Sequence, residues 1–393
     1  MRRLLFGLFL CLFFLFPLVS CAETAEELTD SCHYSASDTS KLFRLTDGKT
    51  KQIFEGRANR ENWIEITAPQ GKAMAGLYIL WKGYTSPVTM EVTSQTGEVS
   101  IQEVNAHFLH EYIVLPQAKK VRLVSTDKKG TLAILELRVF GEGHPPEDVQ
   151  VWQDAPDKND LLVFVAHPDD EYIFLGGTIP YYCVERKLQV VVCYMTCKDE
   201  FRLHELLNGL WTAGCHTYPE LLDFEDKLCS QLKTAYKYWG GIDAALDGVA
   251  QMLERTRPDV VITQDTNGEY GHGGHMGVAD LSLRIIRDEE RTLSFRPQKL
   301  YLHLFPERPI MMDWDQPLTD MNGLTSLDLA KQAFACHVSQ QGYSHETRSG
   351  KKFRFEVVSH GMFDNASFGL AYSSVGDDVY QNDFMENVIP SLP

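Results

Sequence analysis

Short alternating or β-branched runs fill the first part of the chain, from about residue 30 to residue 143. They include the segments WIEITA, AGLYILW, VTMEVT and KVRLVST, which span residues 63–68, 75–81, 88–93 and 120–126. Turn signals such as Asp47-Gly48 and Thr96-Gly97 separate these runs. Short strands that recur about every 8–12 residues are typical of a β-sandwich. We therefore expect an all-β jelly-roll sandwich over residues 30–143.

The second part of the chain alternates strand-like and helix-like runs. Apolar runs at residues 161–166, 188–196, 259–264 and 299–305 predict buried strands. Helical periods predict helices at residues 182–186, 202–214, 242–258 and 275–291. This order predicts an α/β fold, a parallel sheet with helices on both faces, over residues 160–393. The stretch between the two parts, residues 144–159, is rich in proline and acid and is predicted to be a linker.

Two polar clusters directly follow predicted strands of the second part. The first is His167-Pro168-Asp169-Asp170-Glu171, and the second is NGEYGHGGH at residues 267–275. In open α/β sheets ligands bind beyond the carboxyl ends of the strands, so these loops are expected to converge. Two imidazoles and one carboxylate, with a position open for water, are the ligand set of a catalytic Zn²⁺. A further carboxylate beside such an ion could take a proton from water.

Each cluster also has a purely structural interpretation. Asp169 or Asp170 could cap the helix that follows, where a negative charge is favourable. The glycines around His272 could mark only a turn, and His272 and His275 could be surface residues. A cap explains one acid, however, and not three acids beside a histidine. Two such clusters at two strand ends favour a hydrolytic metal site.

The motif AHPDDE at residues 166–171, followed by the distal pair His272-x-x-His275, resembles the PIG-L/LmbE family of zinc-dependent N-deacetylases. The resemblance runs from Asp160 to about Asn387. It implies a Rossmann-like fold without a dinucleotide and hydrolysis of the acetamide of an N-acetylglucosaminyl compound. It also implies Zn²⁺, although Fe²⁺ or Co²⁺ could use the same ligands.

Matched by position, the resemblance implies that His167, Asp170 and His275 are the metal ligands. It implies that Asp169 is the general base and that His272 stabilises the oxyanion of the tetrahedral intermediate. Amide hydrolysis at a metal site needs both functions, a general base for the attacking water and a donor that stabilises the oxyanion.

Two further residues take roles from the same resemblance. Tyr270 matches a tyrosine that can swing over the site. Arg202 matches an arginine that contacts sugar hydroxyls. The alternative for Arg202 is a solvated position in the first turn of a helix. The family often has Pro-Asp between the two distal histidines, where this chain has Gly273-Gly274. The missing aspartate could have oriented His272, and Glu269 is a candidate to replace it.

The first domain resembles a discoidin or factor-5/8 type C domain through LTDGKTKQIFEG, WIEI and ILELRVFGEG. That family has a galactose-binding-like sandwich, which implies that this domain binds a glycan. Trp63, Trp81 and Tyr84 could stack on sugar rings, and the alternative is that they pack in the core.

The N-terminus has the features of a secretory signal over residues 1–20. Arg2 and Arg3 precede an uncharged apolar run that ends at Val19. The sequence Leu18-Val19-Ser20-Cys21 resembles a bacterial lipobox and predicts lipidation at Cys21, with ordinary cleavage after Ala22 as the alternative. We expect an extracytoplasmic protein, on the cell surface or in the periplasm, whose contact with the membrane is made only through the lipid.

The net charge and the cysteine content limit the binding partners and the kinds of cysteine site that we expect. The formal net charge is -17, from 37 basic and 54 acidic residues, which argues against nucleic acid or anionic lipid as the main partner. Of nine cysteines, those beyond Cys11 and Cys21 are odd in number and unevenly spaced. They predict unpaired thiols and not a disulfide framework. A metal site formed by Cys193 and Cys197 is the alternative for these two residues.

The sequence thus predicts a secreted metal-dependent N-deacetylase that acts on an N-acetylglucosamine-containing glycan or glycoconjugate. One alternative is an amidase for another acyl amine, and another is a non-catalytic carbohydrate-binding lipoprotein. A glycosidase that uses paired carboxylates fits less well, because it does not need the His-x-x-His pair.

Overall fold

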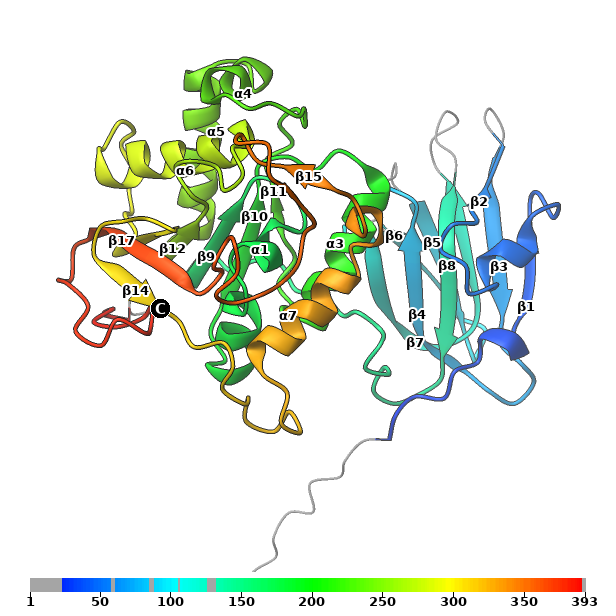
Figure 1. Cartoon of the computed structure of the whole chain (residues 1–393). Coiled ribbons are helices and arrows are strands. Elements are labelled where there is room, and N and C mark those ends of the chain that lie inside the picture. Colours follow the sequence, from blue (N-terminus) through cyan, green and yellow to red (C-terminus); the bar gives the residue numbers. More distant parts are fainter. Residues whose placement is uncertain (1–22, 58–60, 85–87, 105–106, 126–131, 391–393) are drawn as a thin grey trace, which may run out of the picture.

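The computed structural model describes residues 23–57, 61–84, 88–104, 107–125 and 132–390, which form a β-sandwich followed by an α/β domain (Figure 1). The predicted signal, its lipobox and Cys21 lie outside the described residues. Within these ranges, no helix is both long and apolar enough to cross a bilayer. The two predicted fold classes, a sandwich and an α/β domain, are confirmed.

The sandwich contains the first eight strands of the described chain. Their bounds are β1 His33–Ala36, β2 Phe54–Glu55, β3 Trp63–Thr67, β4 Met74–Trp81, β5 Val88–Ser94, β6 Val99–Val104, β7 His110–Ser125 and β8 Ala133–Phe140. Two short 3₁₀ turns, η1 Thr29–Ser31 and η2 Leu42–Leu45, flank β1. Sequence periodicity predicts β3, β4, β5 and the second half of β7. The strands β1 and β2 are too short to show a period, whereas β8, with a burial pattern of five buried residues in a row, does not alternate.

Strand β7 joins the two layers of the sandwich. Its first half, up to Ala118, pairs antiparallel with β4, and its second half pairs with β3 on one side and β5 on the other. Gln117, between the halves, has a left-handed backbone with φ of 50°. One strand can therefore serve both layers because its backbone turns at this residue.

The aromatic residues considered for sugar stacking lie in three different settings. Trp81 is fully buried, and its indole Nε1 donates a hydrogen bond of 2.7 Å to Glu111. The Arg122 guanidinium covers the ring of Trp63 at 4.5 Å. The hydroxyl of Tyr84 lies 3.2 Å from that of Tyr218, in the second domain. Trp81 is therefore a core residue, and the expectation that it could stack on a sugar is wrong.

The second domain is built on a seven-stranded sheet in the order β11-β10-β9-β12-β13-β17-β14. The strands are β9 Asn159–Val165, β10 Val190–Tyr194, β11 Glu220–Leu221, β12 Pro258–Thr263, β13 Lys299–His303, β14 Pro309–Met311 and β17 Ser367–Ser373. Strands β9 to β13 are parallel, but β17 runs antiparallel to both β13 and β14. The predicted all-parallel sheet is therefore wrong at this edge. A strand that returns antiparallel needs no crossover helix, so the alternating strand and helix pattern gave no sign of it.

Helices cover both faces of this sheet, as predicted. One face packs on α1 Asp170–Ile173, α2 Thr178–Pro180, α3 Glu200–Thr212 and α7 Ser326–Ala335. The other packs on α4 Leu232–Tyr238, α5 Ile242–Thr256 and α6 Gly273–Ser282. Shorter elements are the π-helical turns η3 Tyr181–Glu185 and η4 Leu283–Arg287, the 3₁₀ turn η5 Val338–Gln340, and the hairpin β15 His345–Glu346 with β16 Lys352–Phe353.

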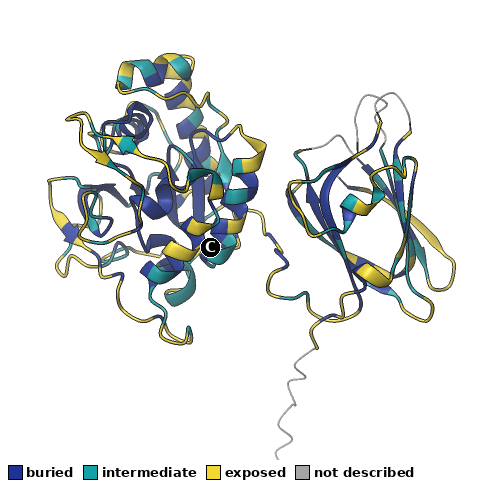
Figure 2. Cartoon of the chain, turned by 45° about the vertical axis from the view of Figure 1, so that its right-hand side comes forward, coloured by how far each residue is buried: buried dark blue, intermediate teal, exposed yellow. Residues whose placement is uncertain are grey.

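The sandwich and the α/β domain each have a buried interior (Figure 2). Several hydrogen bonds join them along helix α3 and the segment before β11. His110 of β7 lies 2.8 Å from His204 of α3, between Nε2 and Nδ1. The hydroxyl of Tyr218 accepts a hydrogen bond of 3.2 Å from the Leu109 amide. The indole of Trp211 donates a bond of 2.9 Å to the Glu147 carbonyl.

All cysteines of the described ranges are unpaired, as the sequence predicts. Cys193 is buried within β10, and burial raises the pKa of Cys197 to about 12. A thiol must lose its proton to bind a metal, so burial argues against a metal pair at these two positions. The one group of histidine, cysteine or acidic side chains that the described residues bring together with metal-site spacing lies elsewhere, at the ends of β9 and β12.

Candidate metal centre

The loops that follow β9 and β12 meet at the carboxyl edge of the sheet. They bring His167, His272 and His275 together, so that one nitrogen of each ring lies within 4.8 Å of the others. The two strands are direct neighbours in the sheet, which explains the convergence. The expected meeting of the two sequence clusters is thus observed.

Asp170 lies between two of these rings. Its Oδ2 is 3.0 Å from Nδ1 of His167, and its Oδ1 is 3.3 Å from Nε2 of His275. Neighbouring ligand atoms of a tetrahedral zinc site with bonds of about 2.0 Å lie roughly 3.3 Å apart. Burial raises the pKa of Asp170, but His275 and His167 outweigh this and leave it below its usual range. A carboxylate anion between two imidazoles fits the donor set of a divalent cation.

His275 is held in one tautomer by a buried acid. Its Nδ1 donates to Oε2 of Glu269 at 2.7 Å, and Oε1 of the same carboxylate lies 3.0 Å from Nδ1 of His303. With the proton on Nδ1, Nε2 carries a lone pair. That nitrogen is buried and has no hydrogen-bond partner among the described residues. An orphaned lone pair facing Asp170 is what a metal ligand requires, and the acid behind it is the usual support.

His272 is held in the opposite tautomer. It is the N-cap of α6, and its Nδ1 accepts a hydrogen bond of 3.1 Å from the Gly274 amide. Burial, together with His275 and His167, lowers the pKa of His272 to about 2. A neutral ring that accepts at Nδ1 carries its proton on Nε2. His272 therefore offers an N–H donor, and not a lone pair, to the site.

Close packing requires the first of the two glycines between these histidines. A Cβ at Gly273 would lie 2.7 Å from both Sγ of Cys229 and the Gln231 carbonyl oxygen. The Gly273 amide also donates to the Cys229 carbonyl at 2.7 Å. The expectation that Glu269 orients His272 is wrong, because Glu269 binds His275 and the Gly274 amide contacts His272.

Asp169 has an unusual backbone for a residue that is not glycine, with φ of 108°. Its amide donates to Oε2 of Glu171 at 2.8 Å, and Oε1 of Glu171 accepts from Tyr194 at 2.7 Å. The Asp169 side chain makes no cap hydrogen bond to α1, so the capping interpretation is wrong for this residue. Burial and the neighbouring Asp170 raise the pKa of Asp169 well above its usual range. Glu171 thus fixes the backbone that presents Asp169, and its own carboxylate contacts Tyr194 and the Asp169 amide.

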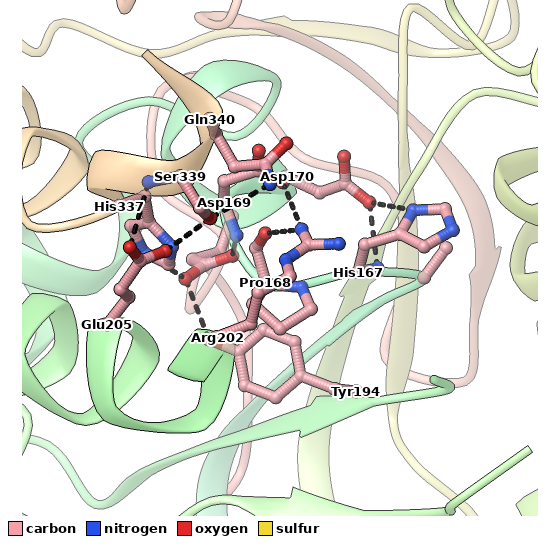
Figure 3. Close-up of polar contacts among 12 residues, drawn as sticks. His167, Pro168, Asp169, Asp170, Tyr194, Arg202, Glu205, His337, Ser339 and Gln340 are labelled. Atoms are coloured by element: carbon pink, nitrogen blue, oxygen red, sulfur yellow. Dashed lines mark hydrogen bonds and ion pairs between the residues drawn. The ribbon is translucent and has the colours of Figure 1, made fainter. Parts of the chain in front are cut away.

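Arg202 points into the same site from the first turn of α3 (Figure 3). Its Nη2 donates to the Pro168 carbonyl at 2.5 Å and lies 3.5 Å from Asp169, while Nη1 lies 3.6 Å from Asp226. The interpretation of Arg202 as a solvated helix residue is therefore wrong. Asp226 also lies 3.7 Å from Nε2 of His167. No motif or periodicity marks Asp226, which belongs to an irregular segment between β11 and α4.

A cavity of about 230 Å³ opens over this cluster. Tyr270 lines it, within 5.4 Å of the His275 ring and 5.7 Å of the His272 ring between centroids. Other lining residues that sequence reasoning missed are Asp226, Leu228, Gln340, His345 and Phe355. All of them come from irregular segments or short elements, so no periodicity marks them. The roles assigned to Tyr270, Arg202 and the ligands remain predictions, although each of these residues lies at the site.

His337 lies behind this site in the core. It is fully buried against Tyr172 and Phe334, and its Nε2 is 3.6 Å from Glu171.

Comparison with known proteins gives a family for the second domain. The PIG-L family, described as GlcNAc-PI de-N-acetylase, matches residues 162–286. A 1D-myo-inositol 2-acetamido-2-deoxy-alpha-D-glucopyranoside deacetylase 1 of Frankia alni is 27% identical over 165 residues, or 34% of this chain and 55% of that protein. The corresponding Mycolicibacterium smegmatis deacetylase is 27% identical over 169 residues, or 36% and 58%. The chain thus spans about half the length of these curated relatives.

Solved structures with some similarity to this chain include two carbohydrate-binding-type modules and a conserved protein. The CBM32 module CpGH89CBM32-6 of Clostridium perfringens has 14% identity and a TM-score of 0.26, and it aligns with 30% of this chain and 100% of its own. An F5/8 type C domain from Bacteroides fragilis has 13% identity and a TM-score of 0.26, with 31% and 98% covered. The conserved protein TT1542 of Thermus thermophilus has 21% identity and a TM-score of 0.32, with 46% and 80% covered. Residues 162–286, which hold both halves of the histidine and carboxylate cluster, are the part of this chain that matches the PIG-L family.

Proposed function

We propose that this protein is a metal-dependent N-deacetylase that removes the acetyl group from an N-acetylglucosamine-containing glycan or glycoconjugate. The observation that carries the proposal is the opposite tautomers of the two distal histidines. His275 presents a lone pair toward Asp170, and His272 presents an N–H donor. A site that holds a cation beside a neutral N–H donor suits attack on an amide carbonyl.

The metal would be held by His167, Asp170 and His275. Zn²⁺ in such a site lowers the pKa of water toward neutral and polarises a carbonyl. The orphaned Nε2 of His275 and the two short distances to Asp170 support this ligand set. The same donors would also accept Fe²⁺ or Co²⁺.

Two side chains would move and stabilise charge during the reaction. The Asp169 carboxylate takes a proton from the attacking water as the new C–O bond forms. It then passes that proton to the amide nitrogen as the C–N bond breaks, so the products are acetate and a free amine. Nε2–H of His272 donates to the carbonyl oxygen, where negative charge develops.

Two further side chains would place the substrate. Arg202 lies 3.5 Å from Asp169 and can hold that carboxylate while its remaining N–H groups meet sugar hydroxyls. Tyr270 covers the two distal imidazoles and would exclude water from the closed site.

The proposal extends to location and to the first domain. The signal-like N-terminus and lipobox support export and a lipid anchor at Cys21, and the sandwich would bind glycan and raise the local concentration of substrate. Incorporation of labelled palmitate into the wild-type protein and not into Cys21→Ser tests the anchor. Label in both proteins, or in neither, would contradict it.

Acetate release tests the activity directly. We expect the zinc-loaded protein to release acetate from at least one member of a panel of N-acetylglucosamine oligomers. Asp169→Asn should abolish release while it retains the metal, and Asp157→Asn, an exposed acid outside the site, should match the wild type. Release of another acid from a different acyl amine would favour the amidase alternative. No turnover of any acyl amine by the loaded protein would favour the carbohydrate-binding alternative.

A further inference from the structure

A second cavity, of about 720 Å³, lies between the two domains. The sandwich contributes Thr50, Lys51, Leu80 and His110 to its wall, and the α/β domain contributes residues of α3 and of the segment 336–340. Its volume falls in the usual range of about 300–1,000 Å³ for ligand pockets. The family match covers α3 and its residue Arg202, but it does not include the wall that the sandwich supplies.

The second cavity adjoins the candidate metal centre. Arg202 and Gln340 line both cavities. The guanidinium of Arg202 is also held beside Asp169, by the bond to the Pro168 carbonyl. A molecule whose amide lies at the metal centre can therefore continue past Arg202 into the space between the domains.

The wall of the cavity carries equal numbers of positive and negative side chains. Lys51 and Arg202 are cationic, while Asp199 and Glu205 are anionic. Both acids are already used by the protein. Asp199 accepts the Phe201 and Arg202 amides at the start of α3, and Glu205 accepts the Ser339 amide and hydroxyl at 2.8 and 2.5 Å. The two buried histidines add no charge at neutral pH, since burial lowers the pKa of both His110 and His204.

The remaining lining groups suit an uncharged polar ligand with apolar faces. Phe201 lines the cavity with 52% of its surface exposed, so its ring is accessible to a ligand there. Asn208, Ser339 and Gln340 add amide and hydroxyl groups. A pyranose ring offers C–H faces to an aromatic ring and hydroxyls to amides, whereas a polyanion would need an excess of cations.

We propose that the cavity between the domains is a saccharide subsite, which holds the sugar next to the one that is deacetylated. The proposal rests on the proposed function for the identity of its substrate. It makes the sandwich part of the substrate site, because residues 50, 51, 80 and 110 complete the wall. It also predicts that the enzyme prefers oligosaccharides to a single N-acetylglucosamine.

Two variants test the subsite in the full-length zinc-loaded protein. Phe201→Ala removes the exposed ring, and Thr50→Trp fills the mouth of the cavity from the sandwich side. For both, we expect the ratio of kcat/KM on the N-acetylglucosamine tetramer to kcat/KM on the monosaccharide to fall about tenfold. Tyr380→Ala, an exposed aromatic that lines neither cavity, should keep the wild-type ratio. Unchanged ratios in both subsite variants would overturn the proposal.

A binding measurement separates failure of the subsite from failure of the activity. If no oligomer releases acetate, the tetramer is titrated calorimetrically into zinc-loaded Asp169→Asn, alone and combined with Phe201→Ala or Thr50→Trp. Binding that weakens about tenfold in both combined variants would support the subsite although the deacetylase proposal fails. Equal binding in all three proteins, or no binding in any, would overturn the subsite as well.

Discussion

Oε2 of Glu269 accepts a hydrogen bond from Nδ1 of His275 at 2.7 Å, and both side chains are fully buried. This bond leaves the lone pair of His275 on Nε2, 3.3 Å from Asp170. The other oxygen of Glu269 lies 3.0 Å from His303, whose Nε2 lies 3.1 Å from the Asp364 carbonyl. Glu269 therefore anchors His275, the proposed metal ligand, to the end of strand β13.

Substitution Glu269→Gln should weaken metal binding about 10–100-fold, because the amide cannot support the Nδ1 proton as a carboxylate does. Competition with a coloured chelator measures the affinity. The exposed Glu307→Gln serves as the matched control. Affinity within about twofold of the wild type would show that Glu269 does not support the ligand.

Substitution Glu171→Ala should lower the free energy of unfolding by about 1–3 kcal/mol, since it leaves the buried amide of Asp169 without an acceptor. Tyr194→Phe removes only the bond to the other oxygen of Glu171 and should cost about 1 kcal/mol. Urea unfolding measures the free energy of unfolding of both variants and of the wild type. Equal losses would mean that the Asp169 amide does not depend on Glu171.

Introducing the proline common in the family, by Gly273→Pro, should destabilise this chain by at least about 1–3 kcal/mol. Proline has no amide to donate to the Cys229 carbonyl, and its Cβ would lie against the Gln231 carbonyl. Thermal unfolding measures the loss. A variant as stable as the wild type would contradict the packing that explains Gly273.

Because His110 is buried without a charge, we expect it to lower the free energy of unfolding as the pH falls into the acidic range. Burial and His204 lower its pKa from 6.5 to about 3, while Nδ1 contacts Gln150 at 2.6 Å. Between these values the unfolded chain binds more protons, so stability is fully present above pH 6.5 and falls as the pH drops toward 3.

The comparison with His110→Asn isolates this contribution. Between pH 6 and pH 4, the free energy of unfolding of the wild type should decline more steeply than that of the variant, by up to about 1.4 kcal/mol per pH unit. Urea unfolding at several pH values gives both slopes. Parallel slopes would show that His110 titrates normally in the folded protein.

Sequence reasoning located the site because its main residues lie in two short motifs at strand ends. The alternation of strands and helices predicts a parallel sheet whose strand-end loops can converge, but it does not predict which strands are neighbours. His167, Asp170 and His275 come together because β9 and β12 lie side by side. The different tasks of His272 and His275 came only from a family resemblance. The structure adds a physical basis, since one ring receives the Gly274 amide and the other contacts Glu269.

Other features depend on contacts between distant segments and left no local pattern. Asp226 lies near Arg202 through an irregular segment that has no hydrophobic period. Strand β17 joins the sheet antiparallel, after a long segment that holds one helix, α7, and is otherwise largely irregular. The cavity between the domains needs residues near 50 and near 200 in one wall, which no sequence spacing reveals.

The central claim is that His167, Asp170 and His275 hold a cation that N-deacetylation requires. The most direct measurement titrates Zn²⁺ into metal-free protein and follows acetate release from N-acetylglucosamine oligomers together with bound metal. The account predicts that activity rises to a plateau at one equivalent of bound zinc, and that His167→Ala binds less metal and stays inactive. Full activity in the metal-free protein, or unchanged metal content in His167→Ala, would contradict it.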